Sequence, residues 1–132
     1  MEGDRFMKMK PMEYKRLFKP EILYCGEFNN HEFAIANQGD HPCAYVENKL
    51  NVTSYDDELI WDVYVHGSLT YCDKSYWNDS KKTFLGWDYA HWGDYTELSL
   101  CGEGKRYTTE EIYEDVKSVI KQLEKIESVA NK

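Results

Sequence analysis

The residues with the most chemical potential gather in two short segments. The first, Val65–Tyr71, reads VHGSLTY, and the alternation of a strand would project His66, Ser68 and Thr70 from one face. An imidazole and two hydroxyls on one face can bind a polar ligand, or they can form a cross-strand hydrogen-bond ladder on a solvated sheet. This segment therefore supplies one half of a predicted site.

The second segment, Gly86–Tyr95, is rich in aromatic, acidic and histidine side chains. If it pairs with the first segment, Asp88 could orient His66 as a general base, or the two could form a structural carboxylate–imidazole hydrogen bond. Its aromatic side chains could instead stack on a planar ring whose polar edge is read by His66, Ser68, Thr70 and Asp88. The aromatic residues in question are Trp87, Tyr89, Trp92 and Tyr95.

A cationic pair could complete this site. Lys105 and Arg106 precede the N-terminal end of the last predicted helix, where a guanidinium and the helix dipole favour an anion, although both could be ordinary surface charges. The full predicted ligand-binding set is His66, Ser68, Thr70, Trp87, Asp88, Tyr89, His91, Trp92, Asp94, Tyr95, Lys105 and Arg106.

A catalytic alternative uses part of the same set. His66, Asp88, His91 and Asp94 could serve a metal-dependent or Asp–His hydrolase that acts on a phosphate ester or nucleotide. However, no H-E-x-x-H spacing, glycine-rich phosphate loop or G-x-S-x-G elbow occurs. We therefore assign no catalytic residue, metal or cofactor, and prefer ligand binding to catalysis.

Charge and composition limit the partners. The chain has 24 acidic and 16 basic residues and a net charge of −8, which argues against nonspecific binding to nucleic-acid backbones. Eleven tyrosines and four tryptophans favour a binding surface or a subunit contact, including a homo-oligomer, although tyrosine is also a strand former.

The expected compartment is the cytoplasm. Met1–Lys10 has no apolar run of signal-peptide length, and no segment reaches the roughly 20 apolar residues of a membrane span, so no membrane partner is expected. The four cysteines, Cys25, Cys43, Cys72 and Cys101, form no C-x-x-C pair and are expected to be free, buried thiols.

The hydrophobic and turn patterns along the chain predict one α+β domain over residues 1–132. We expect an N-terminal arm or short helix at 1–19 and an antiparallel sheet of about five to six strands within 21–101. Its expected strands are Ile22–Phe28, Glu32–Asn37 after an Asn29-Asn30 turn, Cys43–Glu47, Trp61–Cys72 and Thr83–His91, with the last two paired and a loop at Asn48–Glu58.

A C-terminal amphipathic helix is predicted over 108–128. Thr108 and Glu111 match the S/T-x-x-E capping box. The apolar stripe that follows consists of Ile112, Val116, Val119, Leu123 and Ile126, with Ile120 beside it. This stripe should pack on the sheet.

Four stretches together resemble a family of small proteins encoded in phages and prophages of Gram-positive bacteria. They are Gly39–Val46 (GDHPCAYV), Val65–Tyr71 (VHGSLTY), Leu85–Tyr95 (LGWDYAHWGDY) and Lys105–Ile112 (KRYTTEEI). The residues on the motif positions are His66, Gly67, Leu69, Thr70, Asp88, Ala90, His91, Gly93 and Asp94, whereas Ser68 stands where the family usually has Gly.

The resemblance implies an uncharacterised phage accessory protein that works in the host bacterial cytoplasm during infection. Its members carry no assigned activity, so the resemblance supplies context rather than mechanism. By analogy with other small anti-defence proteins, we expect a small-molecule ligand, with a host cyclic-nucleotide immune signal as the candidate for sequestration. A protein-binding inhibitor of a host enzyme is a further alternative.

Overall fold

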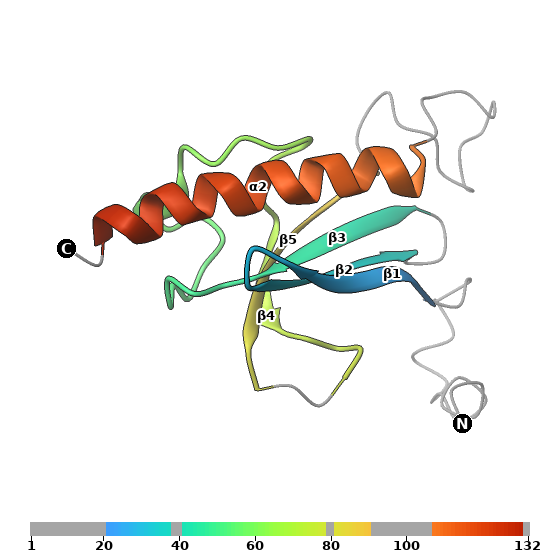
Figure 1. Ribbon diagram of the computed structural model, residues 1–132, viewed down its shortest axis with the longest axis horizontal. Coiled ribbons are helices and arrows are strands. Elements are labelled where there is room, and N and C mark those ends of the chain that lie inside the picture. Colours follow the sequence, from blue (N-terminus) through green and yellow to red (C-terminus); the bar gives the residue numbers. More distant parts are fainter. Residues whose placement is uncertain (1–20, 38–40, 79–80, 91–106, 131–132) are drawn as a thin grey trace.

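The computed structural model of the chain describes residues 21–37, 41–78, 81–90 and 107–130. In this part of the chain, five antiparallel strands form an open sheet in the order β1-β2-β3-β5-β4. The strands are β1 (Glu21–Phe28), β2 (His31–Asn37), β3 (Pro42–Glu47), β4 (Tyr71–Lys74) and β5 (Thr83–Asp88). The helix α2 (Thr109–Ala130) lies across one face of the sheet (Figure 1).

This architecture confirms the predicted α+β fold with its C-terminal helix on an antiparallel sheet. The predicted N-terminal arm or helix at 1–19 and the part of the predicted sheet region at 91–101 lie outside the described residues. In the described ranges, no helix is both long enough and apolar enough to cross a membrane.

The first hairpin forms as its turn residues dictate. Asn29 and Asn30 have φ angles of 50° and 65°, the left-handed region that asparagine tolerates better than most residues. β1 and β2 pair on either side of this turn, with Phe28 opposite His31. Pro42 opens β3, where its missing N–H costs least.

The predicted strand Trp61–Cys72 is wrong over most of its length. A short 3-10 helix, Glu58–Ile60, precedes it, and only Tyr71–Lys74 forms a strand, which pairs with β5 as predicted. The chain instead turns at Gly67 and Ser68, whose φ angles are 69° and 68°. His66, Ser68 and Thr70 therefore do not project together from one strand face.

The apolar alternation in that segment nevertheless marks residues that are buried. Val63, Val65 and Leu69 are among the buried residues of the main core, which also includes α2. Gln122 of α2 holds the segment in place, since it accepts a hydrogen bond from the Tyr64 amide at 2.7 Å and donates one to the Tyr64 carbonyl at 2.8 Å. The hydrophobic pattern therefore predicts correctly which residues are buried, but its prediction of a strand is wrong.

The two faces of the sheet bury different sets of side chains. On the helix side, Ile35, Val46, Leu85 and Trp87 pack against α2. On the other side, alternate residues of the same strands form a smaller cluster of Ala36, Cys43, Tyr45 and Phe84. Tyr71 and Trp77 pack against this second cluster, so both faces are covered by large side chains.

The helix begins and packs as its sequence predicts. The Thr108 hydroxyl accepts the Glu111 amide at 3.1 Å, and the Glu111 carboxylate accepts the Thr108 amide at 3.0 Å, which completes the capping box. Its buried residues are Ile112, Val116, Val119, Ile120 and Leu123. Ile126 is partly buried against the same core.

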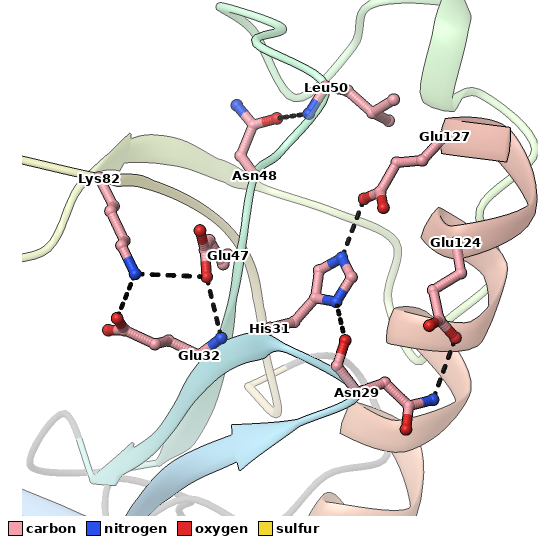
Figure 2. Close-up of polar contacts among 9 residues, drawn as sticks. All are labelled: Asn29, His31, Glu32, Glu47, Asn48, Leu50, Lys82, Glu124 and Glu127. Atoms are coloured by element: carbon pink, nitrogen blue, oxygen red, sulfur yellow. Dashed lines mark hydrogen bonds and ion pairs between the residues drawn. The ribbon is translucent and has the colours of Figure 1, made fainter. Parts of the chain in front are cut away.

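Polar contacts tie the first hairpin to the C-terminal half of α2 (Figure 2). His31, only 2% exposed, contacts the Glu127 carboxylate through Nε2 and the Asn29 carbonyl through Nδ1, both at 2.9 Å. The Asn29 side-chain amide also donates to Glu124 at 3.1 Å. These contacts connect residues nearly a hundred positions apart and fix the hairpin against the helix.

Candidate functional site

The helix-free face of the sheet is organised around Gly86. In the register of the sheet, Gly86 lies opposite Tyr45 on one side and opposite Tyr71 on the other. The two tyrosine rings meet at this point, with centroids 4.8 Å apart and nearly perpendicular planes. A side chain at Gly86 would occupy their space, because an added Cβ would lie 2.5 Å from Tyr45 Cδ1.

Three further aromatic side chains extend this contact into a layer. Trp77 packs against Tyr45, Tyr76 and Phe84, with ring centroids 4.9–5.1 Å apart. We call Tyr45, Tyr71, Tyr76, Trp77 and Phe84 the aromatic layer. Edge-to-face packing of this kind stabilises the orientation of each ring, so the Tyr45 hydroxyl has a fixed direction.

That hydroxyl points toward a buried thiol. Tyr45 Oη lies 3.2 Å from Cys43 Sγ, and Cys43 Sγ donates to the Ala36 carbonyl at 3.8 Å. The Ala36 carbonyl can only accept, so the thiol donates there, while the Tyr45 hydroxyl lies within hydrogen-bond distance of the sulfur. Burial, followed by the proximity of Cys43, raises the pKa of Tyr45 well above its ordinary value. Tyr45 is therefore a neutral phenol at physiological pH.

A hollow of about 180 Å³ opens beside this pair, where β3 begins and β5 ends. Its described lining residues are His41, Cys43, Tyr45, Thr70, Tyr71, Trp87 and Asp88. We call it the strand-end hollow. Cys43 and Asp88 face each other across the β3–β5 register, and the Asp88 carboxylate accepts the Ala90 amide at 3.1 Å. The hollow thus combines a carboxylate, an imidazole and hydroxyls with aromatic walls.

Three of the predicted binding residues line this hollow: Thr70, Trp87 and Asp88. Trp87 is 1% exposed, so the indole is part of the core and contributes a wall rather than an open stacking surface. The lining residues outside the predicted binding set are His41, Cys43, Tyr45 and Tyr71. The shared parity of Cys43 and Tyr45 in one strand was the available signal.

His66 belongs to a different environment. Its ring stacks on Tyr89, with centroids 4.9 Å apart and planes 10° apart, and its Nδ1 lies 3.4 Å from the Tyr107 hydroxyl. Tyr89 is buried on the helix side and donates to Asp115 of α2 at 2.5 Å, whereas alternation along β5 places Asp88 on the opposite face. The geometry thus separates His66 from Asp88.

The Tyr89 hydroxyl is the centre of a buried hydrogen-bond chain. It accepts from Trp87 Nε1 at 3.0 Å and donates to Asp115, which gives both buried polar groups a partner. Burial, followed by the hydrogen bond to Asp115, raises the pKa of Tyr89. Trp87 and Tyr89 therefore support the core beneath the hollow.

The remaining predicted binding residues His91, Trp92, Asp94, Tyr95, Lys105 and Arg106 lie outside the described residues. Within the described ranges, no group of three or more His, Cys, Asp or Glu side chains is placed to hold a metal ion. No disulfide joins the described cysteines, as predicted, but only Cys43 is fully buried; Cys72 is partly buried and Cys25 is exposed. Cys101 lies outside the described residues.

No family model matches the chain, and no curated protein or solved structure matches it significantly.

A second hollow, of about 370 Å³, is larger but simpler. It runs along the outer side of α2 and is lined by Glu114, Lys117, Ser118, Lys121, Gln122 and Lys125. All of these residues belong to one helix, so this surface has none of the convergent chemistry of the strand-end hollow.

Ser68 has a backbone conformation that favours glycine. Its φ of 68° is in the left-handed region, which disfavours residues with a Cβ by about 1 kcal/mol. Ser68→Gly should leave stability unchanged or raise it by up to about 1 kcal/mol, since relief of strain is partly offset by the larger entropy of the unfolded chain. Urea denaturation measures this change, and a loss above about 1 kcal/mol would show that the Ser68 side chain has a structural role.

The aromatic layer also predicts alkaline sensitivity. Burial raises the pKa of Tyr76 to about 12 and raises that of Tyr45 further, whereas an unfolded tyrosine titrates near pH 10. Between these values the folded protein holds protons that the unfolded chain has lost, so stability is complete below about pH 10 and falls from there through about pH 12.

Urea midpoints measured between pH 8 and pH 12 test this dependence. Tyr45→Phe should make the alkaline fall shallower, whereas Tyr64→Phe, at an 84% exposed position, should leave it unchanged. A fall of equal steepness in all three proteins would contradict the assignment to the aromatic layer.

Proposed function

We propose that this protein binds a small planar ligand with a polar edge in the strand-end hollow. The observation that carries this proposal is convergence: segments around residues 41–45, 70–71 and 87–88 all line one hollow. These segments belong to three of the four stretches on which the resemblance to phage proteins rests. Aromatic walls with a few oriented polar groups are typical of small-molecule sites.

The size of the hollow limits how much of a ligand it can enclose. At about 180 Å³ it is smaller than the roughly 300–1,000 Å³ of sites that enclose a whole drug-sized molecule. It would receive one ring and leave the rest of the ligand outside. A nucleobase fits this description, with Asp88, His41 and Thr70 as the groups that contact its polar edge and the sugar and phosphate outside the hollow.

In its biological form, the proposal is that a phage accessory protein sequesters a host cyclic-nucleotide immune signal. The support is the sequence resemblance together with a site suited to a base. Sequestration requires only binding, which agrees with a hollow that holds a carboxylate and an imidazole but, among its described lining residues, no lysine or arginine to stabilise charge on a reacting phosphate.

Calorimetry with a panel of cyclic mono-, di- and trinucleotides tests this proposal. We expect saturable heat with at least one of them, and at least about tenfold weaker binding for Asp88→Asn, because loss of one charge-assisted hydrogen bond costs about 1.5–3 kcal/mol. Asp73→Asn, on neighbouring β4, is the matched control and should bind like the parent protein.

The state of the recovered ligand separates the alternatives. Ligand released intact after heat denaturation of the complex supports sequestration, whereas ligand released chemically altered supports the hydrolase. Absence of heat with every member of the panel would overturn the cyclic-nucleotide proposal.

A further inference from the structure

A second surface, formed by other residues than those of the strand-end hollow, exposes large apolar and aromatic side chains. Tyr55, Leu59, Trp61 and Tyr64 are all exposed, and Trp61 and Tyr64 are 68% and 84% exposed. All four lie within residues 55–64, which we call the aromatic loop. Single exposed apolar residues are normal on a protein surface, but a cluster with Trp and Tyr is typical of an interaction site.

The exposed residues are held on an ordered backbone. The 3-10 turn Glu58–Ile60 is capped by Asp57, whose side chain accepts the Leu59 amide at 2.8 Å. Ile60 and Val63 are buried beneath the loop, and the Trp61 indole donates to the Asp56 carbonyl at 2.6 Å. The backbone of the loop and the Trp61 ring are therefore ordered before association, which lowers the entropy lost on binding.

The aromatic loop is also acidic, with no basic residue to balance its charge. It contains Asp56, Asp57, Glu58 and Asp62, and no lysine or arginine occurs between Leu50 and Asp73. A partner surface must therefore supply positive charge around a depression that can receive an aromatic side chain.

The outer side of α2 has these properties. The hollow of about 370 Å³ described above is lined by Lys117, Lys121 and Lys125, with Glu114 as its acid. We call it the lysine groove. The buried residues of α2 occupy the opposite side of the helix, so the lysine groove faces away from the core.

The aromatic loop and the lysine groove adjoin each other. Gln122, which lines the groove, is the residue that binds both backbone groups of Tyr64. Figure 1 shows the segment between β3 and β4 beside α2. A twofold contact requires a projection and its complementary depression on the same side of one subunit, so that each copy gives one and receives the other.

We propose that the chain forms a twofold dimer in which the aromatic loop of one copy occupies the lysine groove of the other. The four acids of the loop would face the three lysines of the groove, and Trp61 and Tyr64 would be the buried anchors. This surface is separate from the strand-end hollow, so the dimer neither requires nor excludes ligand binding there.

Sedimentation velocity over a range of protein concentrations tests the dimer. We expect a reversible monomer–dimer equilibrium that weakens with salt, because exposed charges are screened. Trp61→Ala and Tyr64→Ala should each weaken it by about thirtyfold or more, as expected for interface hot spots. Both side chains are exposed in the monomer, so circular dichroism should show that the variants remain folded.

A charge exchange makes the test specific. Asp56→Lys/Glu58→Lys/Asp62→Lys changes the net charge of the loop from −4 to +2, and Lys121→Glu/Lys125→Glu changes that of the groove from +2 to −2. Each of these variants alone should be monomeric, because like charges then meet at both contacts. Their equimolar mixture should dimerise, because each loop then meets a groove of opposite charge.

Three results would overturn the proposal. The first is a protein that stays monomeric at every concentration. The second is a dimer that is insensitive to Trp61→Ala, which would place the contact elsewhere. The third is a mixture of the two charge variants that stays monomeric. The candidate partner of the aromatic loop would then be a basic surface on a different protein.

Discussion

Replacing Gly86 with Ala should destabilise the protein by about 1–3 kcal/mol, the usual cost of forcing a methyl group into a packed interior. The added Cβ would lie 2.5 Å from Tyr45 Cδ1 and 2.9 Å from the Ala44 carbonyl oxygen. The carbonyl is part of the backbone, and the Tyr45 ring is held by the aromatic layer, so neither neighbour can move aside alone. Because Tyr45 lines the strand-end hollow, ligand binding should weaken as well. Urea denaturation and calorimetry measure the two effects.

Gly26→Ala is the matched control for this prediction. Gly26 is also a strand glycine, but a Cβ there would contact only the Phe33 ring at 3.6 Å, an ordinary van der Waals distance. Its substitution should change stability by no more than about 0.5 kcal/mol, as most surface changes do. If the two variants were equally stable, the tight packing at Gly86 would not be a constraint on the fold.

Replacing Glu127 with Ala should cost about 1–3 kcal/mol, because it leaves a buried imidazole nitrogen without its partner. His31 Nδ1 faces the Asn29 carbonyl, which only accepts, so the ring must donate there. Nε2 faces the Glu127 carboxylate, and a proton must therefore lie between these two groups as well. His31 is 2% exposed in the folded protein, so its Nε2 depends on Glu127 for a hydrogen-bond partner.

Glu124→Ala removes the same side chain three residues away on the same helix. Its contact with Asn29 is exposed, so we expect a change of about 0.5 kcal/mol or less. The difference between the two variants in urea denaturation isolates the His31 contact, since the change in helix propensity is the same. Equal losses in both variants would mean that the buried pair contributes nothing beyond the lost side chain.

Local signals were sufficient for much of the fold. The Asn29-Asn30 turn and the Thr108–Glu111 capping box each have a short-range physical cause, and the structure confirms both. The predicted strand over 61–70 is wrong because a strand and an irregular, partly buried segment can show the same alternation of apolar and polar residues. Val63, Val65 and Leu69 are buried in the core without forming a strand, and the chain turns at Gly67 and Ser68.

The candidate site was harder to predict, because its composition depends on which strands become neighbours. Thr70 and Asp88 were selected from their own segments, but His41 and Cys43 join them only through the pairing of β3 with β5, a strand distant in sequence. Likewise, the expected His66–Asp88 pair required both residues on one face. The turn at Gly67 moves His66 to the helix side, where it stacks on Tyr89.

Amide chemical shifts during a titration with the cyclic-nucleotide panel test the strand-end hollow most directly. We expect saturable shifts at His41, Cys43, Thr70 and Asp88, with little change at Trp61, Tyr64 or along the outer side of α2. Saturable shifts confined to the aromatic loop or the lysine groove, with His41, Thr70 and Asp88 unmoved, would contradict it.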